Sequence, residues 1–412
     1  MTGAPADVYL HIGLHKTGTT YLQNVMRANR AGMRAQGVEF TGGPDEPVQA
    51  FAVWDLQGRR PRGTRDARIA GQWNELVEAV NGSGRPTALV SEERLSLCTL
   101  KQVRRAVEAF PDSTVHVVVT ARDLGRVAVS AWQEEVKNDQ TWTWQEFVAA
   151  IKDPEQVATN PARVFWMRQD LLRICETWEA VVPAERIHVL TVPPSGTSPA
   201  ELLGRFASVV GFNARKLTEE PVWSNETVGV AGTEVIRRVN ARLEGRLNQR
   251  QYDRVIKMTV VKLLADRTDP ARFTLPGAEV GWVSERAEQL IDALRERGYP
   301  VEGDLDELRP RVRDGGRCPD DATDDELLEA ALDALAMLSE KYATTWWRRR
   351  KLGPRESEGG SGDLGSKARA AVFRSQRKAA EVADRQPAAA KALGMVLKAR
   401  DRATARARAR NR

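Results

Sequence analysis

Short apolar runs alternate with amphipathic stretches along most of the chain, and the two periods predict two kinds of element. The apolar runs predict strands at 8–12 (VYLHI), 87–91 (TALVS), 114–120 (TVHVVVT) and 186–192 (RIHVLTV). Apolar residues at helical spacing predict helices at 19–36, 66–80, 99–109, 124–138, 143–152, 161–182, 199–210, 227–248, 253–266, 284–297 and 323–343. Because strands alternate with helices, we expect an α/β fold in which helices cover both faces of a parallel sheet.

Composition divides the chain into further parts. Gly, Pro, Arg and Asp are frequent at 41–64, which predicts a long irregular loop. We expect the α/β domain to span 1–315 and a helical extension to follow at 316–352. Residues 353–366 (GPRESEGGSGDLGS) have the composition of a flexible linker. The last part, 367–412, is a basic tail that is either helical or disordered.

The positive net charge of the chain, +6, comes from this tail. Residues 367–412 hold 14 Lys or Arg and 3 Asp or Glu, a net charge of +11, which leaves −5 for the remainder. Such a tail is either a solvated extension, a contact for an anionic membrane surface, or a contact for nucleic acid. Trp346 and Trp347 precede four basic residues, which favours the membrane interface. Nucleic acid is the weaker alternative, because Phe373 is the tail's one aromatic residue and no known binding module is present.

Several classes of protein are excluded by what the sequence lacks. No apolar run reaches the roughly 18 residues that a membrane span needs, so an integral membrane protein is not expected. The first residues show no basic segment followed by an apolar stretch, so we expect a cytoplasmic protein, with peripheral membrane contact through the tail as an option. Cys98, Cys175 and Cys318 are scattered, which predicts neither a disulfide framework nor a zinc site.

Candidate chemistry begins directly after the first predicted strand, at 13–21 (GLHKTGTTY). Glycines between a strand and a helix let backbone N–H groups converge, and the helix N-terminus adds positive charge, so this loop is suited to a phosphate or sulfate group. Lys16 would add a full charge there. The hydroxyl donors are Thr17, Thr19 and Thr20. A tight turn would also explain the glycines, and the loop is not a Walker motif, because Lys16 precedes Gly18.

The order of these residues resembles the 5′-phosphosulfate loop of sulfotransferases that use 3′-phosphoadenosine 5′-phosphosulfate (PAPS), in particular bacterial carbohydrate-type members. In that family a strand leads into Lys-x-Gly-Thr-Thr and then an aromatic or apolar residue. Lys16, Gly18, Thr19 and Thr20 match this motif, and Tyr21 stands where the family often stacks a residue on adenine.

A second motif supports the resemblance. The family binds the 3′-phosphate of the donor with an Arg at the end of a strand and a Ser eight residues later. Here Arg122 follows the strand at 114–120, and Ser130 lies eight residues further on. A surface ion pair would explain Arg122 alone, but not both motifs in this order. The resemblance covers about 8–300 and implies a P-loop-NTPase-like sheet flanked by helices.

The resemblance implies in-line transfer of a sulfuryl group from PAPS to an acceptor hydroxyl, on a sugar or glycolipid, with no metal required. Lys16 would stabilise the leaving phosphate oxygen. The strand at 87–91 ends in Ser91-Glu92-Glu93, similar to the family's Ser-x-Glu, so Glu93 is the first candidate for the base and Glu92 the alternate. Helix capping would also explain either carboxylate. His15 is a further candidate for assisting the sulfonate.

Other aromatic and polar residues are weaker candidates. Trp54, in the predicted loop, is a candidate for lining the acceptor site, whereas the His residues within strands, His11, His116 and His188, are expected to be packed. Two alternative functions stay open. A nucleotide-dependent kinase would use Asp123 as a magnesium ligand, although it lacks the Gly-Lys-Ser/Thr order. A non-catalytic protein with a nucleotide-binding fold would act through its basic tail.

Overall fold

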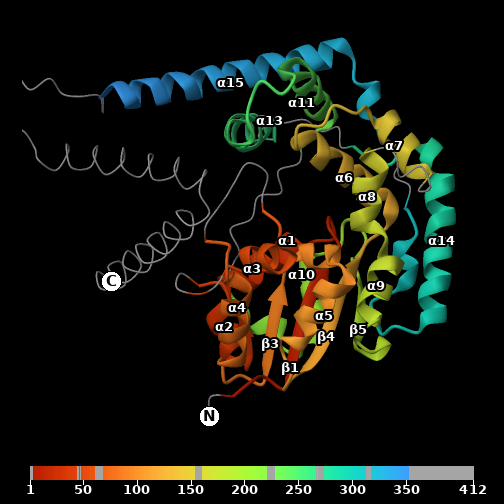
Figure 1. Cartoon of the computed structure of the whole chain (residues 1–412). Helices are drawn as coiled ribbons and strands as arrows, with labels where there is room; N and C mark the ends of the chain where they lie inside the picture. Colours follow the sequence, from red (N-terminus) through yellow and green to blue (C-terminus); the bar gives the residue numbers. More distant parts are fainter. Residues whose placement is uncertain are drawn as a thin grey trace, which may run out of the picture.

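The computed structural model describes residues 3–43, 46, 48–60, 68–153, 160–219, 228–265, 267, 273–311 and 317–351. Within these residues the strands form one parallel sheet in the order β2-β3-β1-β4-β5-β6. They are β1 Asp7–Gly13, β2 Val38–Phe40, β3 Thr87–Ser91, β4 Thr114–Ala121, β5 Ile187–Thr191 and β6 Val301–Glu302. Helices flank the sheet (Figure 1), which confirms the predicted α/β class.

Both faces of the sheet are buried. Along β4, Val117 and Val119 face one apolar cluster and Val118 faces the other, as the two-residue period of a strand requires. The first cluster is completed by α3 Gln49–Gln57, α4 Gln72–Asn81, α5 Leu100–Glu108, α9 Leu171–Glu179 and α14 Val280–Arg297. The second is completed by α1 Thr19–Ala28, α2 Arg30–Ala35 and α10 Pro199–Val210.

A third apolar cluster is built from helices and lies beyond the carboxyl ends of the strands (Figure 1). Trp132 is fully buried in it and meets Trp144 and Phe273 edge to face. The cluster joins α6 Leu124–Lys137, α7 Trp144–Lys152, α8 Asn160–Gln169, α11 Val230–Leu243, α12 Gln249–Tyr252, a π-helical segment Asp253–Val260, α13 Val261–Ala265 and α15 Asp324–Lys351. Because α6 starts directly after β4, it connects this cluster to the carboxyl ends of the strands.

Two predicted helices are interrupted by a polar residue. The helix expected at 19–36 divides at Asn29, whose side-chain amide donates to the carbonyl of Val25 at 2.9 Å. The helix expected at 161–182 divides at Asp170, whose carboxylate accepts the backbone N–H of Arg173 at 3.2 Å and so begins α9. Side chains that bond to nearby backbone groups compete with a continuous helix.

The prediction of an irregular loop at 41–64 is wrong in part, because α3 occupies Gln49–Gln57. Ala52, Val53 and Leu56 are buried on this helix in the first cluster. The short edge strands β2 and β6 were not predicted. The predicted linker and tail, 353–412, lie outside the described residues. In the part of the chain that is described, no helix has the length and apolarity to cross a membrane.

Candidate active site

The loops that follow β3, β1 and β4 meet at the carboxyl edge of the sheet, because β1 lies between β3 and β4. This is the edge at which parallel α/β sheets bind ligands. A Cβ added at Gly13 would come within 3.1 Å of the Cβ of Glu93, and Arg122 Nη1 donates to the carbonyl of Lys16 at 3.1 Å. The loop at 13–21, called the phosphate loop after the group it is predicted to bind, the candidate bases and Arg122 come from three separate segments and are therefore neighbours.

Three residues of the phosphate loop have backbone φ angles in the left-handed region. Gly13, Lys16 and Gly18 have φ of 94°, 67° and 87°, and a non-glycine residue at positive φ is a strained position typical of binding loops. The hydroxyl of Thr17 donates to the carbonyl of Leu14 at 2.5 Å and lies 2.6 Å from Thr120 Oγ1. Thr17 is fully buried, so its hydroxyl fixes the loop from within.

The remaining threonines and Tyr21 lie at the start of α1, which Gly18 precedes. The hydroxyl of Thr19 donates to Glu93 Oε2. Thr20 is exposed in the first turn, and half-buried Tyr21 lines a surface hollow between α1 and α10. This helix N-terminus therefore presents Thr20 to solvent, while Thr19 contacts the candidate base.

Lys16 points toward a carboxylate that the sequence analysis missed. Its Nζ lies 3.4 Å from Glu134 Oε2, and the other oxygen of Glu134 accepts a hydrogen bond from Lys257 Nζ at 3.0 Å. Burial acts to raise the pKa of Glu134, but the charges of Lys16 and Lys257 outweigh it and hold that pKa at about 2. One signal was available in the sequence: Glu134 lies one helical turn after Ser130.

Glu93 and His15 face each other across the phosphate loop. His15 Nε2 lies 3.9 Å from Glu93 Oε1, and the side chain of Gln169 donates to the carbonyl of His15 at 3.0 Å. Burial lowers the pKa of His15 to about 4; the charge of Glu93 opposes this, whereas Arg168, Arg94 and Lys16 lower the pKa further. His15 is thus a neutral imidazole near pH 7. Its buried Nδ1 has no hydrogen-bond partner among the described residues.

Glu92 lies in different surroundings. It is 7% exposed and burial raises its pKa, while its carboxylate pairs with Arg94. The guanidinium of Arg94 in turn lies 4.7 Å from the ring centre of Trp54 on α3. Glu92 therefore belongs to an ion pair beside Trp54, whereas Glu93 contacts the phosphate loop.

Arg122 and Ser130 line one cavity of about 320 Å³ at the start of α6. Its charged lining residues are Arg122, Asp123, Arg126, Glu307, Arg309 and Arg311. Burial, with Arg126 nearby, lowers the pKa of Arg122 to about 10, which still leaves it a cation at neutral pH. Arg122 Nε is buried and has no hydrogen-bond partner among the described residues. Because Arg122 lines the cavity as a cation, an anion bound there would pair with its charge.

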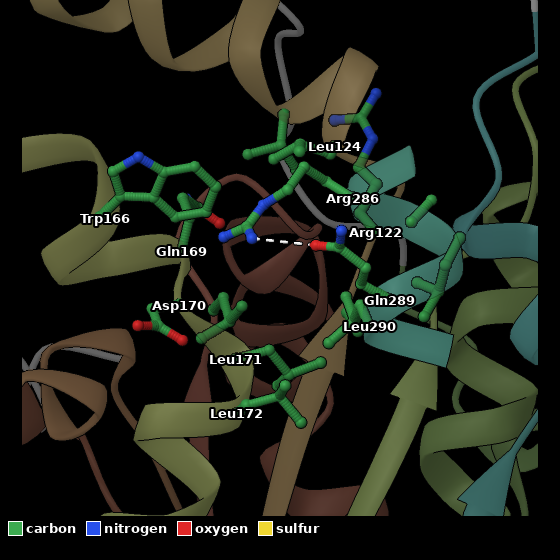
Figure 2. A pocket seen from close by; sticks show the side chains of 15 residues that line it. Arg122, Leu124, Trp166, Gln169, Asp170, Leu171, Leu172, Arg286, Gln289 and Leu290 are labelled. Carbon is green, nitrogen blue, oxygen red and sulfur yellow. Dashed lines mark hydrogen bonds between the residues drawn. The ribbon is translucent and has the colours of Figure 1, made fainter. Parts of the chain in front are cut away.

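Arg122 also lines a second, mostly apolar cavity of about 210 Å³ (Figure 2). There the guanidinium of Arg286 lies 5.2 Å from the ring centre of Trp166 and donates to Gln289 at 3.0 Å. Apolar walls come from Leu124, Leu171, Leu172 and Leu290. This cavity could not be predicted from the sequence, because α6, the α8–α9 segment and α14, which contribute most of its lining, are far apart in the chain.

The other candidates have structural partners. His11 Nδ1 lies 2.7 Å from Ser91 Oγ in the core. His116 and His188 are half-buried, and Nδ1 of His116 lies 3.1 Å from Nε2 of His188. Asp123 accepts the backbone N–H of Arg126 at 2.9 Å and pairs with its side chain, so it caps α6. Among the described residues, no three His, Cys, Asp or Glu side chains are grouped so that they could hold a metal ion.

Comparisons with known proteins give a distant structural similarity. No family model matches the chain, and no curated protein matches it. Among solved structures, the chain is similar to a sulfotransferase from Alicyclobacillus acidocaldarius, with 15% sequence identity and a TM-score of 0.37. The alignment covers 59% of this chain and 95% of the other. Values this low assign no activity to this chain.

Proposed function

We propose that this protein is a sulfotransferase that moves a sulfuryl group from PAPS to a hydroxyl group of a sugar or glycolipid. One observation carries the proposal: Lys16 in a loop with strained backbone angles, Arg122 bonded to that loop, and Glu93 beside it meet at the carboxyl ends of the strands. Arg122 and Ser130 share a cavity next to the loop, as a second anion site for the 3′-phosphate requires.

The residues have distinct roles in this proposal. The N–H of Leu14 donates to the carbonyl of Thr120, so in this proposal the loop amides from His15 onward, with Lys16, bind the 5′-phosphosulfate. Lys16 stabilises the charge that develops on the leaving phosphate oxygen. Glu93 accepts the proton of the acceptor hydroxyl as that oxygen bonds to sulfur and the sulfur–oxygen bond to the phosphate breaks. The contact between Thr19 and Glu93 orients the base toward the loop. Neutral His15 lines the same region and provides a hydrogen-bonding group without adding charge.

Glu93 is favoured over Glu92 as the base because of their partners. Arg94 pairs with one oxygen of Glu92, whose side chain is 9% exposed against 27% for Glu93, and a general base must lie within reach of the proton that it removes. Glu93 Oε1 is 3.9 Å from His15 Nε2, which is beyond hydrogen-bond distance. Trp54 contacts Arg94, the partner of Glu92, so its proposed place at the acceptor site rests on the closeness of Glu92 to Glu93 in the chain.

The kinase alternative is disfavoured by Asp123. In that alternative Asp123 would hold magnesium, but here its carboxylate caps α6 and pairs with Arg126. The Gly-Lys-Ser/Thr order is also absent from the loop.

Calorimetric titration of the full chain with 3′-phosphoadenosine 5′-phosphate (PAP), beside ATP with magnesium, tests the proposal. We expect PAP to bind and Lys16→Met to weaken that binding at least roughly tenfold, because one full charge of the loop is lost. Lys101→Met, which removes an exposed lysine of α5, is the control and should bind PAP as the wild type does. Binding of ATP with magnesium in place of PAP would contradict the proposal and favour a kinase.

A further inference from the structure

Glu134 on α6 lies between two lysines that come from distant parts of the chain. Lys16 Nζ is 3.4 Å from one oxygen of Glu134, and Lys257 Nζ is 3.0 Å from the other. Asn138, which follows the last residue of α6, donates to Glu134 at 3.1 Å and accepts from Lys257 at 2.7 Å. Three elements, the phosphate loop, α6 and the π-helical segment, therefore meet in one charged chain of contacts.

The segment that carries Lys257 has an uncommon geometry. Residues Asp253–Val260 form π-helical turns between α12 and α13. Such turns are rare in proteins, and those that do occur are often found at functional sites. Tyr252, just before the segment, donates to Asn240 at 2.8 Å and accepts the backbone N–H of Asp139 at 3.1 Å. These contacts fix the start of the segment against the end of α6, beside Asn138.

The charges of the three groups have a consequence for any anion that binds the loop. Lys16 with Glu134 alone sums to zero, and the carboxylate so close to Lys16 would repel an incoming phosphate or sulfonate. Lys257 brings the sum to +1. All three side chains are about one-third exposed, so the charges are only partly screened by water.

We propose that Glu134 and Lys257 are positioning residues of the active site. Glu134 holds the ammonium group of Lys16 beside the phosphate loop, and Lys257 offsets the charge of Glu134 so that the site keeps a net positive charge toward the donor. This inference rests on the proposed function for the identity of the anion. The alternative is an ion pair that only attaches the helical cluster to the loop.

Titration with PAP at several salt concentrations tests the role of Lys257. We expect Lys257→Met to weaken PAP binding roughly five- to tenfold at low salt, and the difference from the wild type to shrink as salt rises. Lys257→Arg, which keeps the charge, should restore binding to within about twofold. Lys152→Met is the matched control, because Lys152 also forms an ion pair, with Glu279 at 2.6 Å, and is 41% exposed against 37% for Lys257.

Glu134→Gln tests the other half of the proposal. This change leaves both lysines charged but removes the group that fixes Lys16, so we expect PAP to bind at least as tightly as to the wild type. Turnover should fall at least roughly tenfold, because a catalytic group out of place loses much of its effect. An ion pair with a purely structural role would not separate binding from turnover in this way. Thermal unfolding of every variant distinguishes loss of the fold from loss of the site.

Two results would overturn the inference. One is PAP binding by Lys257→Met that equals that of the wild type and of Lys152→Met at every salt concentration. The other is wild-type turnover in Glu134→Gln. If the wild type itself binds no PAP, the proposed function is wrong, and titration of the same variants with inorganic pyrophosphate then decides the charge argument by the same criteria.

Discussion

Glu92 and Glu93 are adjacent in the chain, and yet their side chains have different partners. Glu92 is buried and pairs with Arg94, whereas Glu93 accepts a hydrogen bond from the hydroxyl of Thr19. We expect Glu93→Gln to lower turnover roughly 10²-fold or more, the usual contribution of a general base, with PAP affinity unchanged. Glu92→Gln is the matched control and should retain turnover within about tenfold. Measuring sulfate transfer from PAPS across a panel of sugars and glycolipids checks this, and the reverse order of the two variants would assign the base to Glu92.

His11, in the core beneath the site, should make the stability of the fold depend on pH. It is fully buried, and burial lowers its pKa to about 4. The unfolded chain therefore binds a proton near pH 6.5 that the folded chain takes up only near pH 4, so stability falls as pH drops between these values. This residue alone should lower the free energy of unfolding by about 2 kcal/mol from pH 7 to pH 5. Urea unfolding of His11→Asn should show a smaller decrease over that interval, and an unchanged decrease would mean that His11 does not titrate this way.

At the scale of elements, the connection between β1 and α1 depends on Gly18. Its φ is 87°, and a Cβ there would lie 2.6 Å from Leu202 Cδ2. Gly211, at the end of α10, has nearly the same φ of 88° but nothing within 4 Å of an added Cβ. Gly211→Ala should cost about 1 kcal/mol of stability, because this backbone region is unfavourable for alanine. Gly18→Ala should cost at least as much, because the side chain of Leu202 must also shift. Only Gly18→Ala should also weaken PAP binding, and equal binding by the two variants would mean that the loop tolerates the change.

The elements also show what a sequence pattern can predict. β3 and β4 were predictable because their apolar runs are long enough to be distinctive, whereas β2 and β6 have three and two residues and carry no pattern. Turn-forming residues on either side concealed α3. Lys16, Arg122 and Ser130 could be chosen because each motif is local. The contact between Glu134 and Lys257 joins residues 123 positions apart, so it needs the tertiary structure.

For the whole molecule, the open prediction concerns the basic tail at 367–412. Its net charge of +11 should attract the chain to anionic surfaces, at about 1 kcal/mol for each basic residue near a membrane. We expect the full chain to sediment with phosphatidylserine vesicles at low salt and to be released at high salt, and a chain that lacks 367–412 to stay unbound. PAP affinity should be the same in both chains. If both chains sediment equally, the tail does not cause binding to the membrane.

In the proposed site Arg122 recognises the 3′-phosphate of the donor, so titration with PAP and with AMP, which lacks that phosphate, measures this recognition. The wild type should prefer PAP by roughly tenfold or more, since a charge-assisted contact to phosphate is lost with AMP. Arg122→Met should bind both ligands more weakly, because it also loses the contact with Lys16, and should bind them equally. If the wild type binds AMP as tightly as PAP, or if Arg122→Met keeps the preference for PAP, Arg122 does not recognise the 3′-phosphate.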